Sequence, residues 1–263
     1  MKYAFYCDRP SVTCRTLARV MGLRKLDDSD PGTHTLRQRK MRGSGWTIIN
    51  YGTSYPPWWD LGVNWVNPPD SVAKAVSKLA TYNRLKEEEV KSVRITDQIA
   101  VAQRWVGDGY RVLTRRDGLS QGRGIQEGIV EGPGLLYSRV FPKTHEYRVF
   151  VGGGTVLDFV EKKAPLSEVQ VDRLIRSHDN GWVFAHGSLS VTPEDKASLE
   201  DLAIRATKAL GLTFGAVDIL ACLNRGTPRR VSNAVVCEVN TAPGLTSVTT
   251  FQKFHEYFSS ITK

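Results

Sequence analysis

The alternation of hydrophobic and polar positions opens on a strand, a helix and a second strand. The apolar run 3–7 predicts a strand, and Ser11 is a typical cap for a helix over 11–21 that Gly22 ends. The apolar segment 46–51 predicts a second, buried strand. These elements make one βα unit, which is too small to fold alone.

An aromatic segment follows at 52–69. It holds Trp58, Trp59 and Trp65 beside four prolines. One interpretation is a proline-stiffened loop that packs its rings on the core. The alternative is a loop that faces a substrate.

The next part of the chain predicts two helices and a strand. Asp70 is a cap for a helix over 71–90, and Thr96 is a cap for a second helix over 97–106. The segment 110–114 has the composition of a strand.

Glycines are dense between 118 and 134, and three strand patterns follow them at 135–141, 146–151 and 155–161. The three glycines 152–154 predict a hairpin turn between the last two strands. A helix is expected at 165–177.

The clearest helix signal lies after residue 190. Thr192 is the cap, Pro193 occupies the first helical position, and Gly211 ends the helix. Strands at 214–222 and 234–239 follow. The predicted fold class is a mixture of α/β and α+β, arranged in several lobes.

Composition places the chain among globular proteins. Of its 263 residues, 41% are hydrophobic and 24% charged, which excludes disordered, collagen-like and coiled-coil proteins. No apolar run approaches the roughly 18–20 residues needed to cross a bilayer. Asp8 interrupts the N-terminal apolar run before a signal-peptide core can form. We therefore expect a cytoplasmic protein with no membrane partner.

The four cysteines form no CxxC pair and have no histidine at zinc spacing. Reduced, partly buried thiols are therefore expected rather than a disulfide framework or a metal site.

The net charge of +9 is concentrated in the first half of the chain. Its densest cluster consists of Arg37, Arg39, Lys40 and Arg42. An anionic partner (a nucleotide, an acidic peptide or a nucleic acid) would explain this cluster, and a solvated loop is the alternative. The sequence contains no DNA- or RNA-reading motif to decide between them.

The segment 115–124 contains the first candidate chemistry. Its glycines allow a backbone to approach a phosphate closely and to direct N–H groups at it. The segment lacks the Gly-Lys-Ser/Thr of a P-loop and the GxGxxG dinucleotide pattern. A plain flexible hairpin is the alternative.

The last two predicted strands carry a second candidate. Glu238 and Asn240 lie two residues apart and share one strand face, and Asp218 lies in the neighbouring strand. Oxygen ligands in this arrangement suit a hard cation such as Mg²⁺. The alternative is a structural hydrogen-bond cluster.

A third candidate lies in the central hairpin. Glu146 and Arg148 share one strand face, and Glu161, Lys162 and Lys163 end the next strand. A carboxylate with several cations near a phosphate site suits phosphoryl transfer. Surface ion pairs are the alternative.

Taken in order, these segments resemble the ATP-grasp superfamily of carboxylate–amine ligases. The resemblance is to the ribosomal-protein-modifying glutamate ligases and, more distantly, to D-alanine–D-alanine ligase, over about residues 70–250. The segments that carry it are Lys78, the glycine-rich 117–124, the hinge 136–141, Glu146-Tyr147-Arg148-Val149, Glu161-Lys162-Lys163-Ala164, Asp218 and Glu238-Val239-Asn240-Thr241-Ala242-Pro243-Gly244-Leu245.

The resemblance implies an ATP-grasp fold with an N-terminal βα (pre-ATP-grasp) lobe. The lobes would be 1–69, a central lobe 70–134 with the phosphate loop, and a metal-binding lobe 135–263. ATP would lie between the last two lobes. The protein would be a Mg-ATP-dependent ligase that activates a carboxylate as an acyl phosphate and joins it to an amine of an amino acid, peptide or protein.

The resemblance also assigns candidate site residues. The metal ligands would be Asp218, Glu238 and Asn240. The nucleotide-binding residues would be Lys78, Arg115, Ser120, Gln121, Gly122, Gly124, Tyr137, Arg139 and Glu146. The catalytic or substrate-side residues would be Arg148, Lys163 and Asn180, with Arg176 beside them. Arg115 replaces the second nucleotide lysine of the family, and the hinge has no acid for the ribose, so Glu146 is the candidate for that role.

Two other classes of function stay open. One is a nucleotide- or nucleic-acid-binding protein of this fold without ligase turnover. The other is an ATP-grasp enzyme that phosphorylates a different acceptor.

Overall fold

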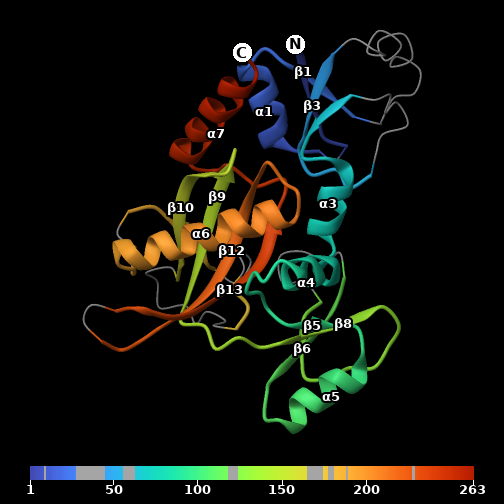
Figure 1. The fold of residues 1–263 in the computed structure, drawn as a ribbon, viewed down its shortest axis with the longest axis vertical. Coiled ribbons are helices and arrows are strands. Elements are labelled where there is room, and N and C mark those ends of the chain that lie inside the picture. The colour runs from blue at the N-terminus through green and yellow to red at the C-terminus, as the bar shows by residue number, and fades with distance from the viewer. Residues whose placement is uncertain are drawn as a thin grey trace.

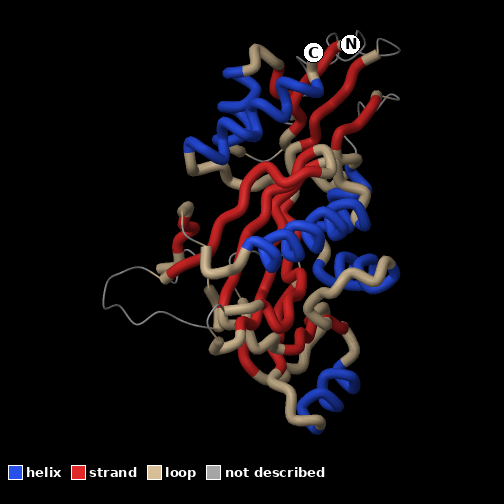
Figure 2. Tube along the Cα trace, turned by 60° about the vertical axis from the view of Figure 1, so that its left-hand side comes forward, coloured by secondary structure: helices blue, strands red, loops and turns tan. Residues whose placement is uncertain are grey.

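The computed structural model describes residues 1–8, 10–27, 45–55, 63–117, 124–164, 174–176, 181–187, 189–226 and 229–263. Within these residues the strands form three sheets, which follow one another along the long axis of the molecule (Figure 1). The view in Figure 2 shows helices packed beside and between these sheets.

The N-terminal sheet confirms the predicted βα unit. Its strands are β1 (Lys2–Tyr6), β2 (Arg24–Leu26), β3 (Trp46–Asn50) and β4 (Asn64–Val66), all parallel and in the order β2-β1-β3-β4. Helix α1 (Val12–Val20) follows Ser11, whose hydroxyl accepts a hydrogen bond from Cys14 N at 3.2 Å. Trp65 lies in β4 and packs against Tyr6, which fits the core-packing interpretation for this ring. Trp58 and Trp59 lie outside the described residues.

The prediction of one helix over 71–90 is wrong. The segment forms α3 (Pro69–Val76) and α4 (Lys78–Glu87), which are separated at Ser77. Ser77 has an extended backbone, and its hydroxyl accepts from Ala80 N at 3.3 Å. A serine whose side chain bonds the backbone ahead of it favours a helix start over a helix interior. Asp70 lies inside the first turn of α3 rather than at its cap.

The smallest of the three units contains a four-stranded sheet with the order β5-β8-β6-β7. Its elements are β5 (Ile95–Thr96), α5 (Ile99–Gly107), β6 (Val112–Arg116), β7 (Gln126–Glu127) and β8 (Leu135–Arg139). Helix α5 begins later than expected because Thr96 pairs with Tyr137 in the sheet, and Gln98 is the N-cap. Since β8 pairs with β5 and β6, this sheet extends past the expected boundary at residue 134.

The third sheet has five strands in the order β11-β10-β9-β12-β13, all antiparallel. The strands are β9 (His145–Gly152), β10 (Thr155–Lys163), β11 (Val183–Ala185), β12 (Phe214–Leu223) and β13 (Val231–Asn240). Gly153 and Gly154 make the predicted turn, both with positive φ. Most of the helix expected at 165–177 lies outside the described residues.

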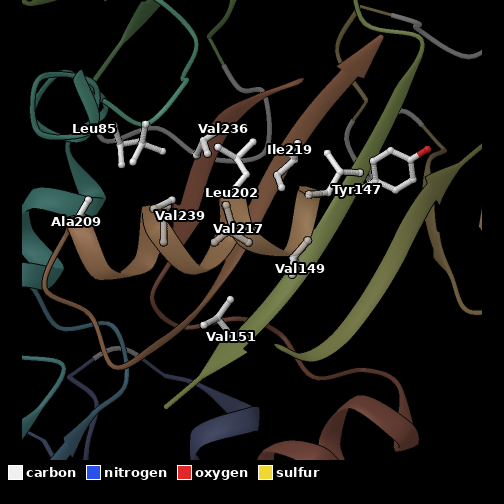
Figure 3. Packing of buried hydrophobic residues seen from close by; sticks show 14 of the residues in the cluster. Leu85, Tyr147, Val149, Val151, Leu202, Ala209, Val217, Ile219, Val236 and Val239 are labelled. Atoms are coloured by element: carbon white, nitrogen blue, oxygen red, sulfur yellow. The ribbon is translucent and has the colours of Figure 1, made fainter. Parts of the chain in front are cut away.

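Helix α6 (Pro193–Ala209) covers one face of this sheet and confirms the sequence prediction, with Thr192 as its cap. Strand residues alternate in direction, so every second side chain joins this core. Val149, Val217 and Val239 point from three strands towards Leu202 of the helix (Figure 3). The residues that precede and follow these valines along each strand point to the opposite face of the sheet.

A second core lies between that opposite face and the N-terminal unit. Helix α7 (Val248–Ile261), which the sequence analysis did not predict, packs there beside α1 and β1. Phe258 contacts Phe5 edge-on, with ring centroids 5.3 Å apart.

The N-terminal unit also contacts the turn that follows β13. The Tyr51 hydroxyl donates to the carbonyl of Pro243 at 2.5 Å. Gly52 adopts φ +91°, and a Cβ placed there would lie 2.5 Å from the Cβ of Ala242. Among the described helices, none has the length and apolarity to cross a membrane.

Candidate functional site

The candidate site begins with a row of charged side chains across three neighbouring strands. Asp218 on β12 lies opposite Arg148 on β9 and opposite Glu238 on β13. Their strand neighbours Val149, Val217 and Val239 belong to the core under α6. The charged row therefore lies on the face of the sheet turned away from α6.

Arg148 and Asp218 form a bidentate ion pair. Arg148 Nε lies 2.6 Å from Asp218 Oδ1, and Nη2 lies 2.8 Å from Oδ2. Burial alone would lower the pKa of Arg148, but the Asp218 carboxylate raises it above the usual value. Burial alone would raise the pKa of Asp218, but the Arg148 guanidinium lowers it. Both groups are therefore charged at neutral pH.

Glu238 is more accessible than Asp218. Its side chain is 36% exposed, and its Oε2 lies 3.8 Å from the ammonium of Lys78 at the start of α4. Asn240 lies on the same strand face, and its Oδ1 accepts from Ala242 N at 2.9 Å. Side chains from α4 and β13 thus meet at Glu238.

The donor set fits Mg²⁺. Mg²⁺ prefers hard oxygen ligands and is commonly held by one or two carboxylates together with substrate phosphates rather than by a cage of protein groups. Asp218 and Glu238 are two such carboxylates on adjacent strands, with the Asn240 amide nearby. Among the described residues there is no cluster of three or more His, Cys, Asp or Glu that could hold a metal ion.

Glu146 lies between two lysines on the same face. Lys162 Nζ is 3.0 Å from Glu146 Oε2, and Lys143 bonds the other carboxylate oxygen. Around the charged row, the cations Lys78, Lys143, Arg148 and Lys162 outnumber the carboxylates Glu146, Asp218 and Glu238 by one. A bound divalent cation would increase this excess, which suits a polyphosphate.

Arg115 reaches this region from the smaller sheet. Its Nη2 donates to the buried hydroxyl of Ser138 at 3.0 Å. Burial raises the pKa of the Cys237 thiol on β13 to about 11, against the opposing effect of the Arg115 charge. Arg115 is thus close enough to β13 to act on it electrostatically, and the Cys237 thiol stays protonated.

Other candidate side chains point elsewhere. The Tyr137 hydroxyl donates to Val130 O within the core of the smallest unit, and Arg139 stacks on Tyr110. The hinge prediction concerned the backbone there, and it stays a prediction. The candidate Lys163 has its Nζ 3.6 Å from Oε2 of Glu161. Its neighbour Lys162 is the lysine that contacts Glu146 beside the charged row.

Several candidates lie outside the described residues, namely Ser120, Gln121, Gly122 and Asn180. Gly124 is described and has φ +67°. Arg176 donates to Thr144 O at 2.9 Å and stacks on Trp182. The roles of all these residues stay predictions.

Phe184 and Lys143 also lie beside the charged row, although no sequence pattern predicted them. The Arg148 guanidinium lies 4.2 Å from the centroid of the Phe184 ring, and the Lys162 ammonium lies 5.3 Å from it. Phe184 is 40% exposed beside the charged row. No periodicity marks either residue, because Phe184 reaches the row from β11 through a tertiary contact and Lys143 precedes β9, three residues before Glu146.

No model of a known protein family matches the chain. Two curated proteins from Stenotrophomonas maltophilia, strains K279a and R551-3, are similar over 226 residues at 25% identity. Each is named a probable alpha-L-glutamate ligase, and the match covers 78% of this chain and 70% of theirs.

Solved structures share the fold across the chain. The D-alanine–D-alanine ligase of Bacillus anthracis has a TM-score of 0.68 at 12% identity, covering 100% of this chain and 98% of its own. The ATP-grasp ligase PsnB, complexed with a minimal precursor, has a TM-score of 0.64 at 12% identity, with 100% and 99% covered. A RimK domain ATP-grasp protein from Sphaerobacter thermophilus has a TM-score of 0.59 at 14% identity, with 98% and 99% covered.

These comparisons confirm the predicted ATP-grasp fold and the resemblance to glutamate ligases. They also agree with the predicted reaction class, an ATP-dependent joining of a carboxylate to an amine. None of the proteins named above is described as binding nucleic acid, so that alternative gains no support.

Proposed function

We propose that this chain, an ATP-grasp ligase by its fold and its sequence relatives, uses Mg²⁺ and ATP to convert a carboxylate to an acyl phosphate and to join it to an amine. The observation that carries the proposal is the row Arg148–Asp218–Glu238, with Lys78 approaching it from another element. A cation-rich row with two carboxylates on adjacent strands suits a metal-bound polyphosphate.

ATP would lie between the smaller sheet and the five-stranded sheet, in line with the three proposed lobes. Asp218 and Glu238, with Asn240, would hold Mg²⁺, which neutralises charge on the β- and γ-phosphates when it is bound. Lys78 and Arg115 would contact the phosphates from the opposite side. The choice of Mg²⁺ and ATP as ligands is supported by structures of the ATP-grasp ligase PsnB complexed with Mg and ADP.

In the first step, a substrate carboxylate oxygen attacks the γ-phosphorus, and ADP leaves. In the second step, the amine nitrogen attacks the acyl carbon, and the bond from this carbon to the phosphate oxygen breaks. Inorganic phosphate leaves with the electron pair of that bond, and the amine releases a proton to solvent. Arg148 would stabilise the negative charge on the phosphoryl group in transfer. Its guanidinium is held in place by Asp218 and stacks on Phe184, so little reorganisation is needed.

The substrates would be amino acids or peptides. The curated relatives are named for glutamate, one structural neighbour for D-alanine, and another is complexed with a precursor peptide. Free amino acids and short peptides are therefore the first pools to test. A cytoplasmic location agrees with these substrate classes and stays part of the proposal.

The test measures ADP release from Mg-ATP by the wild type with pooled amino acids, short peptides or single-stranded DNA. Glu238→Gln keeps the size of the side chain and removes its charge. Glu256→Gln, on the exposed face of α7, is the matched control. We expect ADP release that requires one pool, yields a product joined by a new amide bond, and disappears only in Glu238→Gln. Turnover that persists in Glu238→Gln would overturn the metal assignment, and a phosphorylated product without a new amide bond would overturn the ligase reaction.

A further inference from the structure

The residues at the start of α4 donate two hydrogen bonds to Asp117, the residue that follows β6. Asp117 Oδ1 accepts from the backbone N–H of Lys78 at 3.0 Å, and Oδ2 accepts from the Ser77 hydroxyl at 2.7 Å. The first turn of a helix has N–H groups without partners inside the helix. Asp117, which follows β6 of the smallest unit, accepts a hydrogen bond from one of these N–H groups, that of Lys78.

Ser77 makes this contact more than a cap. Its hydroxyl donates to the Asp117 carboxylate and accepts from Ala80 N, so it links this carboxylate to an amide in the first turn of α4. Ser77 is also the residue at which the chain leaves α3 with an extended backbone. The direction of α4 relative to α3 is therefore set at Ser77, the residue whose hydroxyl is bound by Asp117.

The contact lies between the two cations proposed for the phosphates. The Lys78 side chain begins at the amide that Asp117 binds, and its ammonium extends to within 3.8 Å of Glu238. Arg115 lies two residues before Asp117 on the other side of the contact and is held by Ser138. Asp117 is thus the point at which the chain carrying Arg115 is joined to the helix carrying Lys78.

We propose that Asp117 is a positioning residue that fixes Lys78 and Arg115 relative to one another before the nucleotide binds. The inference rests on the proposed function, because it takes Mg-ATP as the ligand of these cations. Asp117 itself would not contact the phosphates, since its carboxylate repels them. Groups held in place before binding lose less freedom when the ligand arrives, which increases affinity without a new contact.

Two variants separate geometry from charge. Asp117→Ala removes both acceptors, whereas Asp117→Asn retains an oxygen for the Lys78 amide and an amide that can donate to the Ser77 hydroxyl. Asp108→Ala, an exposed aspartate at the end of α5 in the same unit, is the matched control. For each protein we would measure the Kd of Mg-ATP by calorimetry, the KM and kcat of ADP release, and the hydrogen exchange of the α4 amides.

We expect about tenfold weaker Mg-ATP binding in Asp117→Ala, the factor that corresponds to about 1.4 kcal/mol. KM should rise with Kd while kcat changes little, because the bound complex restores the arrangement. A role in folding alone would reduce the active fraction, and with it kcat, without changing KM. Asp117→Asn and Asp108→Ala should bind as the wild type does.

Hydrogen exchange of the α4 amides, measured without nucleotide, should be faster in Asp117→Ala than in the wild type if Asp117 holds the start of this helix. Wild-type exchange and wild-type affinity in Asp117→Ala would overturn the inference. Equal weakening in Asp117→Asn and Asp117→Ala would also overturn it, because charge rather than geometry would be responsible. A wild type that fails to bind Mg-ATP would instead contradict the proposed function, so the two failures are distinguishable.

Discussion

Asp218 and Glu238 lie side by side, yet we expect their loss to affect stability very differently. Asp218→Asn leaves Arg148 with a neutral partner, and the two side chains are only 18% and 15% exposed. Glu238→Gln changes a side chain that is 36% exposed and whose only ion pair among the described residues is a 3.8 Å contact with Lys78. Each variant removes one negative charge from the same row.

The magnitude follows from burial. Removing one partner of a buried ion pair costs about 3–5 kcal/mol. Asparagine keeps one acceptor for Arg148 and the pair is not fully buried, so we expect a loss of about 2–3 kcal/mol. For a chain of this size that corresponds to a fall in Tm of roughly 4–12 °C. Glu238→Gln should change the free energy of unfolding by no more than about 0.5 kcal/mol.

The assay is thermal unfolding without nucleotide or Mg²⁺, followed by circular dichroism, and then Mg-dependent ADP release. Both variants should lose turnover, but only Asp218→Asn should lose stability. If Asp218→Asn melts within a degree of the wild type, the Arg148–Asp218 pair does not stabilise the free protein. If both variants lose stability equally, the difference in burial is not the cause.

Two further predictions concern the regions around the site. Gly52→Ala should cost about 1–3 kcal/mol and reduce turnover, because its Cβ would collide with Ala242 in the turn after β13; Gly22→Ala, which has a positive φ but open space, is the control, and equal costs would contradict the collision. Burial would raise the pKa of Asp158, but hydrogen bonds from α7, including one from Lys253, lower it below 3.8. Its stabilising effect is therefore present above pH 3.8 and lost as the pH falls towards the lower folded value. Urea unfolding between pH 5 and 3 should show a shallower loss of stability in Asp158→Asn, and equal slopes would contradict the assignment.

Local signals predicted some elements well. Helix α6 begins and ends where Thr192, Pro193 and Gly211 indicate, because these residues act on the backbone next to them. The same kind of reasoning failed at Ser77, where apolar spacing continues through a serine that starts a new helix. Helix α7 was missed because its β-branched and aromatic residues are common in strands, and packing in the second core decides its conformation.

The site shows a similar division. Strand alternation correctly predicted a shared face for Glu146 and Arg148, and the register brings Asp218 opposite Glu238. The contacts of Phe184 and Asp117 join segments that are distant in sequence, and no local pattern encodes them. The ligand roles of the row stay predictions for the experiments above.

The second core has a consequence for how the protein folds. Phe5 and Leu17 come from the first elements of the chain, and Phe254 and Phe258 come from α7. During synthesis, Phe5 lacks its contact with Phe258 until α7 has left the ribosome. Contacts between such distant segments form slowly, and unpaired apolar surface favours aggregation. The second core is therefore completed only after α7, which follows all the other described helices and strands in the chain, has docked.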